Sequence, residues 1–314
     1  MERSNFLQLE PGLLEPSTLA YACGGFTVAR HDFNVGFRLQ AQLLPGKVLI
    51  GLSAAEEPDA RWFGKSIGSE SLGITGGPIE LSATGSSTFY AITVDLRSRR
   101  PYVGPSYRRL AALASTRASC MGNAPGVSYA LRSQLTQLFN RPSEPQKAIE
   151  ATLWRTVERV VLPIVSKALA GEYLAEAAPA VARRVDAVRR CEAYVRDNVG
   201  TDITLAELSA VSRLRLRSLI NAFQAVTGLS PMAYLKRQRL NEVRRALRRG
   251  RAGTRIIDVA ANWGFWHMGH FTTDYRVLFG ELPSQTLGRA RTRLQAKLGA
   301  KPTLDGLHFS VKLA

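Results

Sequence analysis

The feature that most constrains this chain is a spacing that occurs twice in its C-terminal half. Glycine follows an aromatic residue by five positions and proline follows it by eight, first at Phe223, Gly228 and Pro231. Tyr275, Gly280 and Pro283 repeat both intervals. Two spaced copies of one supersecondary unit indicate an internal repeat. The C-terminal half is therefore expected to contain the same small unit twice.

The second copy, VAANWGFWHMGHFTTDYRVLFGELP, predicts two helices joined by a turn at Gly264. Ile256, Val259, Ala260 and Trp263 follow the spacing of a helix with one buried face, and glycine turns without a Cβ penalty. The second helix has Phe271, Tyr275, Leu278 and Phe279 on its inner side, and His267, Met268, Gly269, Thr272 and Thr273 on its outer side. This layout is typical of a helix-turn-helix whose second helix enters a DNA major groove. For one such stretch alone, an ordinary helical hairpin is an equal alternative.

Between the two copies lies a stretch that predicts one long basic helix, SPMAYLKRQRLNEVRRALRRG. Leu240, Val243 and Leu247 share a face, while seven Lys and Arg residues lie between Lys236 and Arg249. So many charges cannot all face a core, so the helix is expected to join the two units and lie near phosphates. Arg244 and Arg248 are the candidate phosphate contacts on it.

Most of the net charge of +17 lies in this region, since residues 183–296 hold 21 Lys and Arg against 9 Asp and Glu. A basic excess concentrated in one domain favours a polyanionic partner. The alternative is a basic proteome from a GC-rich genome. That alternative explains why arginine outnumbers lysine, but not the asymmetry along the chain.

These residues resemble a known family. Residues 183–296 are similar to the DNA-binding domain of AraC/XylS transcription regulators, which has two helix-turn-helix units bridged by one long helix. The match rests on Gly228, Ser230, Pro231, Tyr234, Leu235, Arg239, Leu240, Val259, Ala260, Gly264, Phe265, Phe271, Phe279, Gly280 and Pro283. WGFWHMGHFTTDYRVLFGELPSQTL and LKRQRLNEVRRAL resemble the branch that contains the ethanolamine-utilisation regulators.

The resemblance implies a regulator of transcription, with activation expected, and no cofactor. Its implied partners are double-stranded promoter DNA, RNA polymerase, a small-molecule effector and a second copy of the chain. The first unit departs from the family pattern, because Arg213 stands where the turn glycine is usual and Arg215 where a serine would cap the next helix. A left-handed arginine costs on the order of 1 kcal/mol, so this unit is expected to turn differently or to pack more loosely.

The recognition helix of the first unit is predicted at about Leu216 to Ala225. Its outward candidates for DNA contact are Arg215, Arg217, Ser218, Ile220 and Asn221. Arginine pairs with guanine and asparagine with adenine in the major groove. In the second unit the candidates are His267, Met268, Thr272 and Thr273, which lack long charged groups and are expected to read thymine methyls and DNA shape. His267 and His270 do not form a predicted metal site.

Residues 1–105 predict an antiparallel β domain, either a sandwich or a barrel. Alternating apolar residues from Phe33 to Leu43 predict one half-buried strand with Arg38 on its polar face, and further strands are expected around residues 26–29, 47–52, 62–63, 73–82 and 89–96. The resemblance implies a cupin-like sensor, for which Trp62, Phe63 and Phe89 are candidate effector contacts. The alternatives are that these aromatic residues are plain core and that the domain only dimerises.

Residues 106–180 predict a helical linker, with apolar stripes at 129–140 and 149–164 that either form a dimer interface or pack on the β domain. The DNA-binding domain is expected at 181–296, with its two units at about 204–225 and 255–279, and a tail at 297–314. Thr204 and Glu207 have the spacing of a capping box, which predicts a helix start. The fold class is thus α+β, an N-terminal β domain followed by an all-α domain.

The remaining features favour a bacterial cytoplasmic protein that associates with the nucleoid when bound to DNA. The N-terminus lacks the basic and apolar regions of a signal peptide, and no apolar run is long enough to span a membrane. A DNA-alkyl acceptor would be an enzymatic alternative, but it needs a thiolate activated by basic neighbours or a metal. Cys23, Cys120 and Cys191 show no such setting, so no enzyme is expected.

Overall fold

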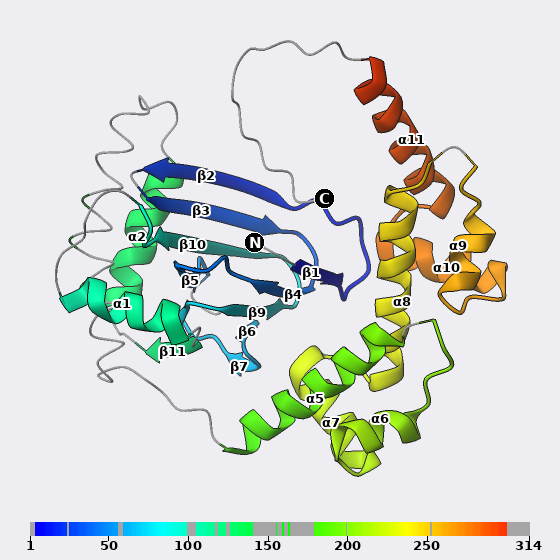
Figure 1. Ribbon diagram of the computed structural model, residues 1–314, viewed down its shortest axis with the longest axis horizontal. Helices are drawn as coiled ribbons and strands as arrows, with labels where there is room; N and C mark the ends of the chain where they lie inside the picture. The colour runs from blue at the N-terminus through cyan, green and yellow to red at the C-terminus, as the bar shows by residue number, and fades with distance from the viewer. Residues whose placement is uncertain are drawn as a thin grey trace. The chain divides into compact units, whose positions relative to one another are not determined.

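The chain divides into two compact units. The computed structural model describes residues 4–23, 25–55, 59–98, 105–116, 119–123, 126–140, 179–198, 200–251 and 253–299, with three isolated positions between 155 and 163. The helical unit combines the short segment Leu7–Leu14 with the described residues from Pro179 onward, and the other described residues form the β unit (Figure 1). Apart from the three isolated positions, the predicted stripe at 149–164 lies outside the described residues, and so does the predicted tail from residue 300 onward.

The β unit contains two antiparallel sheets, as the sequence predicts for a sandwich. The first has the order β1-β4-β9-β6-β7. Its strands are β1 (Ser4–Gln8), β4 (Phe37–Gln42), β9 (Pro78–Ala83), β6 (Ala60–Trp62) and β7 (Lys65–Ser66). The second has the order β11-β8-β5-β10-β3-β2. Its strands are β11 (Ser119–Asn123), β8 (Ser71–Thr75), β5 (Lys47–Ser53), β10 (Ser87–Asp95), β3 (Phe26–Phe33) and β2 (Ser17–Cys23).

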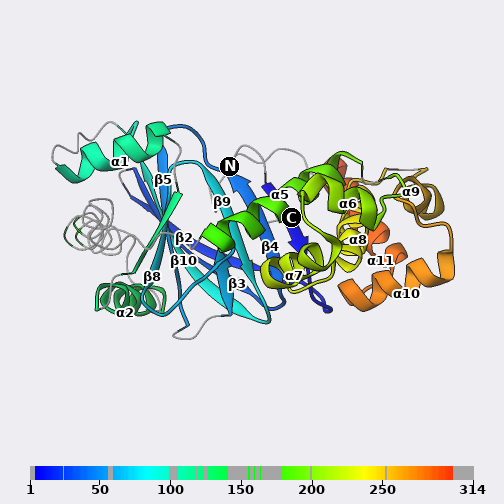
Figure 2. The same ribbon diagram turned by 90° about the horizontal axis from the view of Figure 1, so that it is seen from below.

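Two helices form a third layer on the second sheet, α1 (Pro105–Thr116) and α2 (Val127–Phe139) (Figure 2). Leu131, Leu135 and Leu138 of α2 are buried against Ile50 and Ile92 of the sheet. The Tyr90 hydroxyl also bonds the Thr136 hydroxyl at 2.9 Å. The apolar stripe predicted at 129–140 therefore packs within the β unit, which is the second of the two alternatives stated above.

The predicted strand from Phe33 to Leu43 is wrong in extent. β3 ends at Phe33, the chain turns at residues 34–36, and β4 begins at Phe37. Phe33, Val35 and Phe37 are all buried, so their alternation imitated one continuous strand. Arg38 was expected on the polar face, but it is 2% exposed and forms an ion pair with Glu80 at 3.5 Å on β9.

The helical unit is built from α5 to α11. These are α5 (Pro179–Asp197), α6 (Leu205–Ser212), α7 (Leu216–Thr227), α8 (Pro231–Arg248), α9 (Ile256–Asn262), α10 (Met268–Phe279) and α11 (Pro283–Gly299). Figure 1 shows α8 as the long helix between α5 to α7 and α9 to α11. Leu219 and Phe223 belong to one buried cluster, and Phe271 and Tyr275 to another. Each half of this unit thus has its own core.

The ends of the helices explain the repeated spacing. Gly228 and Gly280 have φ of 73° and 66° and cap the C-termini of α7 and α10 in the left-handed conformation that glycine adopts without strain. Pro231 and Pro283 are the first residues of α8 and α11, where a missing N–H costs no helical hydrogen bond. The capping box predicted at Thr204 and Glu207 is confirmed.

Candidate DNA-binding surface

The first helix-turn-helix consists of α6 and α7, joined by a turn at Arg213. Arg213 has φ of 58° and ψ of 28°, so this arginine itself adopts the left-handed conformation, and the expected alternative turn is not needed. The Arg190 guanidinium donates to the Ser212 carbonyl at 2.6 Å and thereby provides a hydrogen-bond partner for a carbonyl at the C-terminal end of α6. Arg215 precedes α7 without a side-chain cap hydrogen bond, in line with the missing serine.

The outer face of α7 contains the residues predicted to contact DNA. Leu219 and Phe223 are fully buried. Arg215, Arg217, Ser218 and Asn221 are exposed, and Ile220 is also 38% exposed. Because the buried residues fix the rotation of α7, the structure brings these side chains together on one solvent-facing side. An amide and guanidinium groups here have the donors and acceptors needed to read base edges.

The second helix-turn-helix consists of α9 and α10, joined at Gly264. Gly264 has φ of 78°, and a Cβ there would lie 3.3 Å from the guanidinium of Arg239 on α8. Glycine adopts this conformation without strain and leaves room for the Arg239 side chain of α8. Arg239 also donates to the Thr201 carbonyl, which ties α8 to the loop before α6.

On α10 the predicted contact residues differ in exposure. His267 and Thr273 are exposed, and Thr272 is half-buried. Met268 is half-buried as well and packs against the core of this half, so it is less outward than expected. The rings of His267 and His270 lie 6.3 Å apart, and the described residues contain no cluster of metal-ligating side chains.

Trp266 is a candidate that sequence reasoning missed. It lies two residues before the first residue of α10 and is 73% exposed, although a large indole ring is usually at least partly buried. An exposed aromatic ring beside a recognition helix can contact a thymine methyl group or sugar. Its position outside the helical periodicity, between Phe265 and His267, was the available signal.

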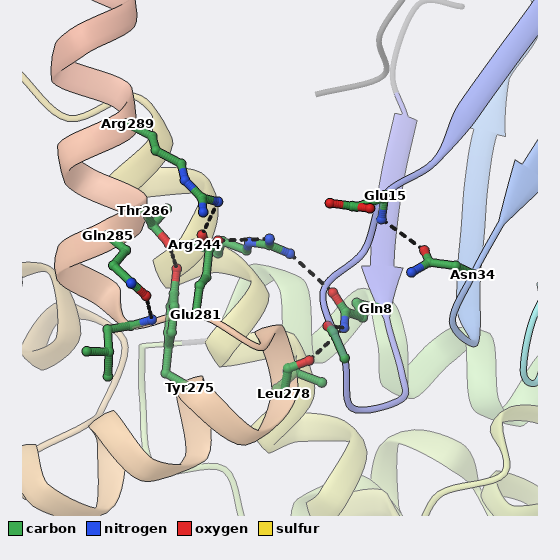
Figure 3. A network of polar contacts seen from close by, with 12 residues as sticks. Gln8, Glu15, Asn34, Arg244, Tyr275, Leu278, Glu281, Gln285, Thr286 and Arg289 are labelled. Carbon is green, nitrogen blue, oxygen red and sulfur yellow. Dashed lines mark hydrogen bonds and ion pairs between the residues drawn. The ribbon is translucent and has the colours of Figure 1, made fainter.

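Arg244 was expected near phosphates, but the structure places it in the interior of the helical unit (Figure 3). It is 5% exposed, and its guanidinium pairs with Glu281 at 2.9 Å and lies over the ring of Phe279 at 4.5 Å. It also donates to the Gln8 side-chain oxygen at 3.1 Å. The prediction that Arg244 contacts phosphate is therefore wrong, because its guanidinium is buried and paired inside the helical unit.

Other basic residues of α8 are also engaged within the unit. Lys236 pairs with Asp274 of α10 at 2.7 Å, and Arg245 pairs with Glu242 on α8 itself. Arg248 and Arg249 at the end of the helix are exposed. Arg248 therefore remains a candidate for phosphate contact at the C-terminal end of α8.

The candidate effector residues lie in the β unit. Trp62 and Phe89 are 4% and 5% exposed, and Phe63 is half-buried in a turn with φ of 49°. A Cβ on Gly73 would lie 2.7 Å from the Trp62 ring, so the indole of one sheet packs directly on the backbone of the other. The Trp62 ring nitrogen is buried and has no hydrogen-bond partner among the described residues. Phe89 packs near Phe37 at 6.1 Å.

Cys191 does not provide a reactive thiol. Its side chain is fully buried on α5 and donates to the Leu208 carbonyl at 3.4 Å. Burial raises the pKa of this thiol to about 11, so the nucleophilic thiolate is not populated near neutral pH. In the described part of the chain, no helix is long and apolar enough to cross a membrane.

The fold and the exposed faces of α7 and α10 define a double helix-turn-helix, and sequence comparisons agree. Residues 208–289 match a family model described as a helix-turn-helix domain. The XylDLEGF operon transcriptional activator of Pseudomonas putida is 34% identical over 99 residues, covering 31% of each chain. A second such activator from this species is 39% identical over 95 residues, covering 30% of this chain and 60% of its own.

A crystal structure of a probable AraC family transcriptional regulator from Rhodopseudomonas palustris is 43% identical, covering 33% of this chain and 97% of the other, with a TM-score of 0.32. This chain thus spans less than two thirds of the length of the two curated relatives named above. The matched region is a helix-turn-helix domain that is similar to part of these transcriptional activators. These matches are to transcription regulators rather than enzymes. They do not support the narrower resemblance to the ethanolamine-utilisation branch.

Proposed function

We propose that this protein is a sequence-specific DNA-binding regulator of transcription that reads two successive segments of major groove with α7 and α10. The observation that carries the proposal is the pair of exposed helix faces, each opposite a buried core. Arg217, Ser218 and Asn221 would read bases in one groove, and His267, Thr272 and Thr273 in the next. Arg248 would contact phosphate.

The charge of the region supports this proposal. Residues 183–296 carry a net charge of +12, although several of their arginines are paired internally. Binding of basic side chains to phosphates releases counterions, so affinity falls steeply as salt rises. Titration of the full chain with promoter DNA from its own gene region at several salt concentrations tests this. Affinity that is unchanged between low and moderate salt would refute DNA binding by this surface.

We further infer that the β unit binds a small-molecule effector between its two sheets. The unpaired ring nitrogen of buried Trp62 supports this, because an unsatisfied buried donor costs about 1–3 kcal/mol and a ligand acceptor would recover it. Phe63 and Phe89 complete the candidate contacts. The alternative is a ligand-independent regulator whose N-terminal domain only dimerises or binds protein partners, for which Trp62 is simply core.

A thermal-shift screen with metabolites from the gene neighbourhood, small amines first, separates these two possibilities. A ligand at a hundredfold excess over its Kd stabilises the folded protein by about 2.7 kcal/mol. Trp62→Phe should reduce the shift, since it removes the donor and keeps a ring. Leu19→Ala, at a 45% exposed position on β2, is the control that should keep it. If no metabolite shifts the melting temperature of the native chain, the ligand-independent alternative is favoured.

We also propose, from the sequence resemblance, that the chain belongs to the ethanolamine-utilisation branch and forms a homodimer. We further propose that it contacts RNA polymerase during activation and is located in the cytoplasm. The leucine stripe of α2 is buried within the β unit, so a dimer would need another surface. Sedimentation of the full chain with and without DNA measures the oligomeric state.

A further inference from the structure

We propose that the segment Leu7–Leu14, here called the N-terminal brace, fixes the distance and angle between the two recognition helices, with Gln8 as its positioning residue. The proposal rests on DNA binding by both helix-turn-helix units. The brace comes from the start of the chain, yet it belongs to the helical unit. Three sets of contacts attach it there.

The first set attaches the brace to the first helix-turn-helix. Leu7 and Leu9 are 1% and 4% exposed and belong to the same buried cluster as Leu219 and Phe223 of α7. Burying two leucine side chains gives a favourable free energy that holds the brace in place. The core of the first unit is therefore completed by residues from the other end of the sequence.

The second set attaches the brace to the second helix-turn-helix. The Gln8 side-chain amide donates to the Leu278 carbonyl at 2.6 Å, and the Gly12 backbone N–H donates to the same carbonyl at 3.1 Å (Figure 3). A Cβ on Gly280 would lie 3.0 Å from the Leu13 nitrogen. Carbonyls in the last turn of a helix need such external donors, so the brace caps the C-terminal end of α10.

The third set attaches the brace to the middle of α8. The Gln8 backbone N–H donates to the Asn241 side-chain oxygen at 3.1 Å, and the Asn241 amide donates to the Gln8 carbonyl at 3.2 Å. The Arg244 guanidinium donates to the Gln8 side-chain oxygen at 3.1 Å. Gln8 itself is fully buried. One residue thus bonds both α8 and α10, while its two leucine neighbours bind the core beneath α7.

These three attachments restrict how the two recognition helices move relative to each other. Besides the brace, the halves are joined by α8 and by a close approach at Gly200, where a Cβ would lie 2.9 Å from the Asn262 carbonyl oxygen. Inserting one base pair between two half-sites displaces the second by about 3.4 Å and rotates it by roughly 35°. A rigid pair of helices should reject that change, and a loosely joined pair should tolerate it.

The test is a competition between two duplexes for the full-length chain. One duplex is recovered by selection from a random-sequence library, and the other contains one additional base pair between its half-sites. The variants are Gln8→Met, which keeps the volume and removes every side-chain hydrogen bond, and Gln8→Glu, which keeps the acceptor for Arg244 and removes the donor to Leu278. Asn5→Ala, in the part of β1 that belongs to the β unit, is the matched control.

We expect the native chain and Asn5→Ala to prefer the selected duplex strongly, and both Gln8 variants to lose about tenfold of that preference. A purely stabilising role would reduce the active fraction equally for both duplexes and leave the ratio of the two affinities unchanged, so an unchanged ratio overturns the proposal.

A native chain that binds both duplexes equally would also overturn the proposal. A selection with the native chain that recovers no duplex would instead refute the proposed DNA-binding function. A Gln8 variant that is folded, as judged by cooperative unfolding, but binds neither duplex would also contradict the proposed role of the brace. An element that sets the spacing of the two helices should change the preference between duplexes and leave the capacity to bind DNA intact.

Discussion

Arg213 and Gly264 adopt the same left-handed backbone conformation in the turns of the two helix-turn-helix units, with φ of 58° and 78°. Three residues, 213–215, separate α6 from α7, whereas five residues, 263–267, separate α9 from α10, so the second connection is two residues longer. The two units therefore share the conformation of the turn but differ in the length of the connection. Only the second has the residue that this conformation favours.

Replacing the strained residue should stabilise the helical unit. Arg213→Gly is expected to raise the free energy of unfolding by about 1 kcal/mol, because glycine has no Cβ to clash in the left-handed region. Arg217→Gly, inside α7, is the matched control and should lower it by about 1 kcal/mol. Thermal unfolding without DNA measures both. A lower melting temperature for Arg213→Gly would show that the arginine side chain contributes more than its strain costs.

Arg217→Ala and Arg248→Ala should affect DNA binding differently. Arg217 is exposed on α7, so its loss should cost roughly 1–3 kcal/mol at one base position and relax specificity there. Arg248 is exposed at the end of α8, so its loss should weaken all sequences and reduce the dependence of affinity on salt. Affinities for duplexes substituted at each position distinguish the two effects. Equal weakening of every sequence by both variants would contradict the assignment of α7.

Arg244→Ala should act on stability rather than on phosphate binding. It leaves the buried carboxylate of Glu281 with Arg289 at 2.7 Å as its remaining ion-pair partner and removes a hydrogen bond to Gln8. Breaking a buried ion pair costs about 3–5 kcal/mol, whereas Arg248→Ala should change stability by less than about 0.5 kcal/mol. Denaturant unfolding of the two variants provides the comparison. If Arg244→Ala and Arg248→Ala had equal free energies of unfolding, the structure around residue 244 would have to relax or admit water.

The stability of the β unit should decrease in mild acid because of His31. Burial lowers the pKa of this imidazole below 6.5, while the nearby Asp32 carboxylate raises it in part. The unfolded state therefore takes up the proton first, so stability falls as pH decreases through about 6.5. His31→Gln should flatten this dependence between about pH 5 and 7, where the carboxylates stay ionised. An unchanged pH profile would assign the effect to other groups.

The features that could be predicted from the sequence are those that depend on residues close together in the chain. The glycine and proline positions that end and begin helices, the capping box at Thr204, and the buried faces of α7 and α10 all follow from short-range patterns. The strand predicted from Phe33 to Leu43 failed because residues on both sides of a tight turn are buried, and periodicity does not detect a reversal of direction.

The misassignment of Arg244 has a different cause. It follows Leu240 by four residues and precedes Leu247 by three, so the helical pattern already placed it on the inner face. Only the fold shows that Glu281 and Gln8 are there to receive its charge. The N-terminal brace was equally beyond reach, because Gln8 and Asn241 are separated by 233 residues and no local pattern links them.

We expect α7 and α10 to contact one face of a DNA duplex at the same time. Hydroxyl-radical footprinting of the full chain on its own promoter region measures this directly. Two protected segments about one helical turn apart, close to 34 Å, are expected, and Arg217→Ala should change base preference in only one of them. A single protected segment that persists when the outer face of α10 is replaced with alanine would contradict it.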